Sequence, residues 1–208
     1  MSIRDHTTPT TPASRISRAL TTLTLRLPNS EEHGAADPKS RSQRLAAIAS
    51  RKAAAISTGL SLPPGPFGLV TILPDLLVIW KLPSQLVSDI AGTYGKTASL
   101  TPESMIYCLF RHGGAALLRD IVVRMGERFV MRRATLRVME DLLSKIGVRI
   151  TQRTLGRALA RYVPLLGAGA IGAYAYYDTS KVASNAIELF AAEIVVQPKS
   201  ARSASGSP

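Results

Sequence analysis

The longest stretch of this sequence without a charged side chain is interrupted by prolines. It covers residues 53–74, which is long enough to cross a bilayer, but Pro63, Pro64 and Pro66 lie in its middle. Proline has no backbone N–H, and its ring clashes with the preceding helical turn, so one continuous helix cannot form there. A membrane-spanning helix needs about 20 consecutive apolar residues. We therefore expect two helices joined by a turn rather than one membrane span.

A second apolar stretch, residues 162–177, is short and rich in glycine. It contains the pattern Gly167-Ala-Gly169-Ala-Ile-Gly172, which matches the G-x-G-x-x-G of dinucleotide-binding proteins. Such a site needs a buried strand before the glycines, whereas residues 157–161 have the pattern of a helix and Pro164 follows them. We interpret the glycines as small residues that let two helices pack closely.

Together the two stretches predict two glycine-rich apolar helical hairpins. The residues expected to form them are Gly65, Gly68 and Asp75 in the first hairpin, and Gly167, Gly169, Gly172 and Asp178 in the second. Two interpretations remain open at this point. The hairpins form the buried core of a helical domain, or they contact a membrane as re-entrant or interfacial segments.

The rest of the chain also has mainly helical patterns. Helices are expected over residues 40–60, from Pro83 to a stop at Gly95, from Thr101-Pro102-Glu103 onward, and over 115–146. The β-branched runs 121–123 and 194–196 are the competing strand signals. The sequence predicts an all-α fold: one compact helical domain over 41–196, with flexible tails at 1–40, rich in Ser, Thr and Pro, and at 197–208.

The charge of the chain favours anionic partners. There are 26 Lys and Arg against 14 Asp and Glu, and the net charge is +12. Arginines spaced four apart would form stripes on a helix, and their guanidinium groups suit phosphates of lipid headgroups or nucleic acid. The two sets are Arg149, Arg153, Arg157 and Arg161, and Arg124, Arg128 and Arg132. A solvated helix face is the alternative, and nucleic acid is less favoured because no recognition module accompanies the charge.

Residues suited to catalysis or metal binding are few. One cysteine and three histidines cannot form a disulfide or fill a zinc site without other ligands. Cys108 and His112 are four apart and could form a thiolate–imidazole pair, but no third orienting group is recognisable. For Asp178, Lys181 is the nearest candidate partner. We expect no enzymatic activity, no cofactor and no metal, with an enzyme using Cys108 and His112 kept as an alternative.

Several of these segments, in this order, resemble the bacterial EcsC protein family. The matching residues are Thr58-Gly59, Gly65-Pro66-Phe67-Gly68, Asp75, Ile90-Ala91-Gly92-Thr93-Tyr94-Gly95, Thr101-Pro102-Glu103 and the run from Val163 to Ala173, within a likeness from about Arg44 to Phe190. The family is named after a protein encoded with an ABC-type exporter, and its biochemical activity is not established. The resemblance implies a helical, membrane-associated bacterial protein.

The expected function is that of a non-enzymatic, membrane-associated accessory protein linked to ABC-type transport. Its expected location is the cytoplasm, peripheral to the inner membrane. The expected partner is an anionic membrane surface, contacted through the arginine stripes and the apolar hairpins, or a membrane protein. A soluble basic protein that binds nucleic acid is the alternative, and the sequence leaves a homo-oligomer open.

Overall fold

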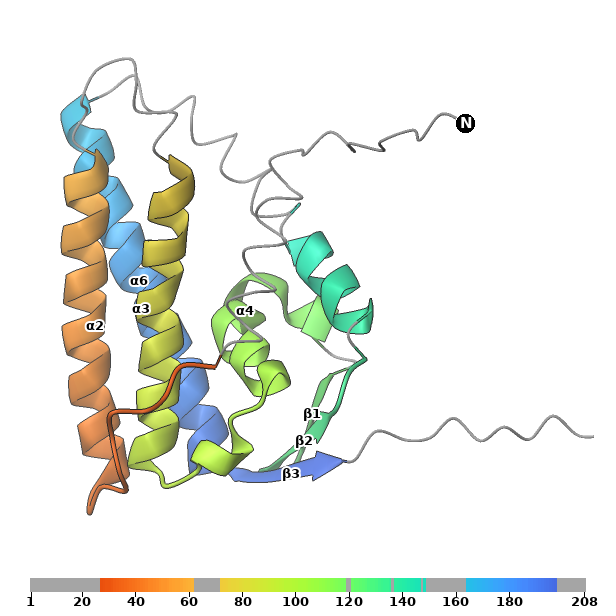
Figure 1. Ribbon diagram of the computed structural model, residues 1–208. Helices are drawn as coiled ribbons and strands as arrows, with labels where there is room; N and C mark the ends of the chain where they lie inside the picture. Colours follow the sequence, from red (N-terminus) through yellow and green to blue (C-terminus); the bar gives the residue numbers. More distant parts are fainter. Residues whose placement is uncertain are drawn as a thin grey trace, which may run out of the picture.

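A computed structural model of the protein describes residues 27–61, 72–118, 121–135, 137–146, 148 and 164–197. Helices make up most of these residues, and a small sheet accompanies them (Figure 1). The helices are α2 (Pro38–Ser61), α3 (Ile72–Thr93), the 3-10 turn η2 (Thr97–Ser99), α4 (Pro102–Leu118), a helix over 137–146, and α6 (Pro164–Ala191). The strands are β1 (Val122–Met125), β2 (Arg128–Arg132) and β3 (Glu193–Gln197).

The fold is mainly helical, as predicted, but it is not all-α, because part of the predicted 115–146 helix is a β-hairpin. Strands β1 and β2 pair antiparallel, with Val123 opposite Val130, and β3 joins β2 in parallel. The turn uses Gly126, whose φ of 63° is in the left-handed region that favours glycine. Side chains on β2 alternate, so Phe129 and Met131 point into the core. Both β-branched runs noted in the sequence lie at or in these strands.

Three long helices, α2, α3 and α6, lie side by side and extend beyond α4 and the sheet (Figure 1). Chain direction reverses between α2 and α3, as expected from the proline-rich turn, which itself lies outside the described residues. Pro83 does not open a helix as predicted, because it lies inside α3. The second glycine-rich segment is not a hairpin within the described residues, since Gly167, Gly169 and Gly172 all belong to the single helix α6.

Local signals in the sequence account for several helix ends. Thr101 and Ser104 form a reciprocal N-cap before α4, with the Ser104 N–H donating to Thr101 Oγ1 at 3.3 Å and the Thr101 N–H donating to Ser104 Oγ at 2.8 Å. Helix α3 ends at Thr93, and the Gly95 N–H then donates to the Gly92 carbonyl. Lys96 follows, and its Nζ donates to the carbonyls of Phe190 and Ala192, which closes the C-terminal end of α6.

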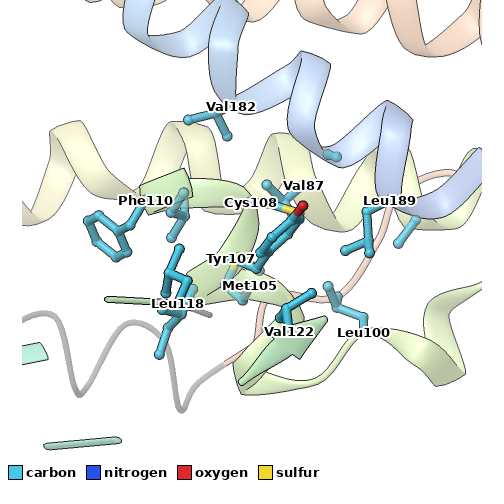
Figure 2. Close-up of a cluster of buried hydrophobic side chains, with 14 of the residues drawn as sticks. Val87, Leu100, Met105, Tyr107, Cys108, Phe110, Leu118, Val122, Val182 and Leu189 are labelled. Carbon is cyan, nitrogen blue, oxygen red and sulfur yellow. The ribbon is translucent and has the colours of Figure 1, made fainter. Parts of the chain in front are cut away.

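The large buried side chains gather where α3, α4, α6 and the sheet meet (Figure 2). Val87, Met105, Val122, Val182 and Leu189 are examples, and each is almost fully buried. Helix α2 contributes less to this core: among its described residues, Ala49 is buried, and Leu45 and Ala46 are partly buried against the core. Hydrophobic burial therefore contributes most to holding α3, α4, α6 and the sheet together, and the attachment of α2 depends more on contacts between small residues.

Helix α2 packs on α6 through small residues, which we call the α2–α6 seam. Ser50 Oγ and Ser180 Oγ share a hydrogen bond of 3.0 Å. Gly172 faces Thr58 and Ala54: a Cβ added at Gly172 would overlap Thr58 Oγ1 and lie 3.2 Å from the Ala54 carbonyl oxygen. The two backbones thus approach more closely than larger side chains would allow.

Residues 27–37 form a strap across α3, although they fall in the segment predicted as a tail. The Ser88 hydroxyl donates to the Pro28 carbonyl at 2.7 Å, and the Glu31 N–H donates to Asp89 Oδ1 at 2.9 Å. The Gly34 N–H donates to the Gly92 carbonyl at 2.9 Å. These contacts extend the packed region at least to residue 27, well before residue 41.

The seam predicts opposite effects of alanine at two glycines of α6. Gly169→Ala should stabilise the protein by up to about 1 kcal/mol, because no described atom lies near its added Cβ and alanine is the better helix former. Gly172→Ala should destabilise it by about 1–3 kcal/mol through overpacking against Thr58. Adding Thr58→Ala should remove the overlap and restore stability. Urea unfolding measures all three, and equal effects at the two glycines would contradict the seam.

The strap should loosen in acid. Arg41 donates to both carboxylate oxygens of Glu32, at 3.0 and 2.6 Å, and this hydrogen bonding lowers the pKa of Glu32 below its ordinary value. A lowered pKa in the folded state means that the stabilisation is present above about pH 4.3 and is lost as the pH falls through the lowered value. Glu32→Gln should imitate the acid effect at pH 7 by speeding hydrogen exchange at the Gly34 and Ala35 amides. Unchanged exchange in that variant would refute the role of the pair.

Candidate functional site

The predicted helical stripe at Arg124, Arg128 and Arg132 does not exist, because the three residues lie on β1 and β2. Arg124 forms an ion pair of 2.6 Å with Glu188, and Arg128 one of 2.8 Å with Glu193. Carboxylates thus compensate two of the three charges, and Arg132 is exposed. The second predicted stripe, Arg149, Arg153, Arg157 and Arg161, lies outside the described residues.

The predicted hairpin residues have different surroundings. Gly65 and Gly68 lie outside the described part, and Asp75 and Gly167 belong to α3 and α6 at positions where only the backbone is described. Gly169 is exposed, whereas Gly172 is buried in the α2–α6 seam. The G-x-G-x-x-G glycines are all within α6 and not at a strand-to-helix turn, so they lack the geometry of a dinucleotide site.

Asp178 has a partner that the sequence did not indicate. His112 Nε2 lies 2.7 Å from Asp178 Oδ1, which links α4 to α6. Lys181, the predicted partner, instead places its Nζ 5.3 Å from the centre of the Tyr177 ring. His112 therefore pairs with an aspartate from another helix rather than with Cys108.

Cys108 is not available as a nucleophile. Its side chain is fully buried, and burial raises the pKa of its thiol. The Asn185 side chain donates to the Cys108 carbonyl at 3.0 Å, which fixes this part of α4 against α6. The described geometry supports the interpretation of Cys108 as a core residue.

A network of charges joins α4, α6 and β1 next to this point. Arg111 and Arg124 both bind the carboxylate of Glu188, and the Arg111 guanidinium stacks 5.3 Å from the centre of the Tyr107 ring. The hydrogen bond to Glu188 raises the pKa of Arg111, and burial raises the pKa of Tyr107 to about 12. Glu188 and Asp178, two acids of α6, are thus both engaged by basic residues of neighbouring elements.

Exposed basic and aromatic residues gather at one level of the three long helices, a feature that we call the basic–aromatic belt. Helices α2 and α6 run antiparallel, with Ser50 opposite Ser180 and Thr58 opposite Gly172. Tyr176 and Tyr177 of α6 therefore lie within about one helical turn of the level of Arg51 and Lys52 of α2. The hydrogen bond between Ser42 of α2 and Thr93 of α3 fixes the level of α3 in the same way. Lys81 lies 12 residues before Thr93 and Ala54 lies 12 residues after Ser42, so Lys81 is level with Ala54. The members are Arg51, Lys52, Lys81, Tyr176 and Tyr177, all exposed, with Tyr177 at 56%.

The belt separates two regions of different composition. Beyond it, away from α4 and the sheet, lie residues 53–61 of α2, 72–80 of α3 and 164–175 of α6, which we call the distal end. Asp75 is the single charged residue of the distal end. On the other side, the face of α2 carries Arg44 and the exposed Ile48, and no Asp or Glu occurs anywhere in α2. The sequence alone does not reveal the belt, because its members come from three helices whose relative level it does not give.

None of the helices in the described ranges combines the length and apolar content that crossing a bilayer requires. Within the same ranges, no group of three or more His, Cys, Asp or Glu residues could hold a metal ion. Comparison of the chain with known protein families, with curated proteins and with solved structures gives no match.

The burial of Cys108 predicts that its thiol reacts slowly in the folded protein. Since the thiolate is the reactive form, a raised pKa and lack of access both suppress modification by Ellman's reagent. We expect negligible reaction in native buffer and complete reaction in urea. Val138→Cys, at an exposed position, should react at once and serve as the control. Rapid labelling of native Cys108 would restore the case for a thiol-dependent activity.

Proposed function

We propose that this chain is a non-enzymatic, membrane-associated protein that binds anionic membrane surfaces through the basic–aromatic belt and the exposed face of α2. The observation that carries the proposal is the belt itself. Tyrosine has an apolar ring and a polar hydroxyl, and it concentrates at the headgroup level of membrane proteins. Lysine and arginine near an anionic surface each contribute about 1 kcal/mol of attraction.

The charge pattern of α2 and α6 supports an anionic partner. Helix α2 contains five basic residues, of which Arg41 is engaged by Glu32, and it contains no acid. On α6, Asp178 and Glu188 are paired with His112, Arg111 and Arg124. Helix α2 therefore presents positive charge with no acid of its own to an approaching bilayer, and Glu188 of α6 is engaged by two arginines from the side of α4 and the sheet.

The resemblance to the EcsC family adds a cellular role to this proposal. A protein of this type would act as an accessory to ABC-type transport, at the cytoplasmic face of the inner membrane. Its contact would be with the membrane surface or with a membrane protein partner. The arginines at 149, 153, 157 and 161 remain a sequence prediction of further contacts, and binding of nucleic acid through the same positive charge is the rival function.

Charge reversal at the belt tests the proposal. Arg51→Glu with Lys52→Glu should weaken binding to vesicles of phosphatidylglycerol and phosphatidylcholine by at least about 30-fold at low salt, because about 2 kcal/mol of attraction is lost. Raising the salt to about 1 M should shrink this difference, as the Debye length falls to about 3 Å. Vesicle sedimentation measures both.

The matched control changes the net charge equally at another place. Arg133→Glu with Arg137→Glu alters two exposed arginines near the sheet and should leave vesicle binding within about threefold of wild type. Equal loss in both variants would mean that net charge alone matters and that the belt is not the contact. A variant that keeps vesicle binding but loses binding to duplex DNA would favour the nucleic-acid function instead.

A further inference from the structure

We propose that two copies of this chain pair along β3, antiparallel about a two-fold axis at Val195, so that their two sheets form one continuous sheet. The inference goes beyond the proposed membrane function and does not depend on it, because it concerns the sheet and not the belt. It rests on three observations: the open edge of β3, the apolar row on the outer face of the sheet, and the charges beside that row.

Strand β3 forms one edge of the sheet. The strand order is β1-β2-β3, and β3 runs along the lower border of the molecule in Figure 1. The N–H and C=O groups on the far side of an edge strand have no ladder partner. In the described part of the chain, no backbone or side-chain group hydrogen-bonds to this side of β3. The edge is therefore a template to which another strand can pair.

The sequence of β3 lacks the features that protect sheet edges. Natural edges are blunted by lysines, prolines, bulges or very short strands. Strand β3 has five residues, contains no lysine or proline, and pairs with β2 without a bulge. Its one charged residue, Glu193, is engaged by Arg128 of β2 at 2.8 Å. The opposite edge, β1, is shorter and carries Arg124, so β3 is the edge better suited to pairing.

The outer face of the sheet carries a row of valines that ends at this edge. Phe129 and Met131 of β2 point into the core, so Val130 between them points to the outer face. The registers place Val123 of β1 and Val195 of β3 on either side of Val130. Val195 is 38% exposed. Pairing of two β3 strands would set the two Val195 side chains against each other and continue the row across both sheets.

One register pairs every residue of β3 with a residue of the second β3. When Val195 lies opposite itself, Ile194 lies opposite Val196 of the second copy. Both of these side chains are partly buried against the core of their own copy, so the pair joins the two cores. A two-fold interface uses the same surface on both copies and closes at the dimer.

The charges beside the row fit a second copy of this chain. In this register Glu193 lies opposite position 197, which is uncharged, so no like charges face each other across the axis. Arg132 is the β2 neighbour of position 197, so it comes within two strand spacings, or about 10 Å, of Glu193 of the second copy. Arg132 is exposed and makes no salt bridge to a described residue. Each copy thus offers an unengaged arginine near the carboxylate of the other.

Sedimentation equilibrium of the full chain without lipid measures the association. The mass should rise with concentration toward twice the 22.3 kDa of one chain. Val195→Lys should raise the dissociation constant at least about tenfold, because two lysines would lie opposite each other at the axis. Val123→Lys makes the same change on the same face at the far strand, and should leave the dissociation constant within about threefold of wild type. A wild type that stays monomeric, or equal loss in both variants, would overturn the inference.

Cysteine cross-linking tests the register without adding charge. Residues directly opposite each other in an antiparallel pair have Cα atoms about 4.5 or 5.5 Å apart, which is within reach of a disulfide. Oxidation should link Val195→Cys into a dimer on a non-reducing gel and leave Val123→Cys monomeric. Cys108 does not compete, because it is fully buried. Linkage at position 195 that is no faster than at position 123 would overturn the inference. Since no lipid is present, that result would leave the proposed membrane function standing, and failure of the belt to bind vesicles would leave the dimer standing.

Discussion

The close approach of α2 to α6 is the constraint on which the rest of this structure depends. Helix α2 places only Leu45, Ala46 and Ala49 in or against the described apolar core, so it gains less from the hydrophobic effect than α3, α4 and α6 and depends more on contact at short range. Gly172 provides that contact by leaving room for Thr58, and the hydrogen bond between Ser50 and Ser180 fixes the register of the two helices. A shift of α2 by one turn would break this bond and would change the level of Arg51 and Lys52 relative to Tyr176 and Tyr177 by about 5 Å. The belt is thus a consequence of the seam.

The strap and the charged network perform the same task at the two flanks of the bundle. Residues 27–37 bind the C-terminal half of α3 by backbone hydrogen bonds and reach α2 through the Glu32–Arg41 pair. On the other flank, His112 and Arg111 of α4 bind Asp178 and Glu188 of α6. Polar contacts therefore fix the outer positions of a bundle whose apolar core lies to one side of its length.

Features that depend on residues close together in the sequence were predicted, and features that depend on residues far apart in the sequence were missed. Helix starts and stops such as Thr101-Pro102 and Gly95 depend on neighbours within a few residues, and they were predicted. The β-hairpin was not, although Gly126 lies between two runs of β-branched and aromatic residues, because the arginines there also fit a helical repeat. The partner of Asp178 was missed because His112 is 66 residues away in the sequence. The different surroundings of Gly169, which is exposed, and Gly172, which contacts Thr58, depend on the position of α2. The glycine pattern alone does not distinguish the two positions.

The pairing of charges also limits which positive residues remain to meet a partner. Counted from the sequence, the arginines of 124–132 looked as suitable for phosphate as any others, but Arg124 and Arg128 are engaged by Glu188 and Glu193. An engaged guanidinium must give up or share its carboxylate before it can bind a phosphate, whereas an exposed lysine or arginine without one loses only water. In the described part of the chain, Arg51, Lys52 and Lys81 are exposed and make no salt bridge. All three border the distal end, whereas other exposed basic residues without a salt bridge in the described ranges lie elsewhere, among them Arg44, Arg132, Arg133 and Arg137. An anionic bilayer surface attracts basic residues that have no carboxylate partner, which is the contact that the proposed function requires.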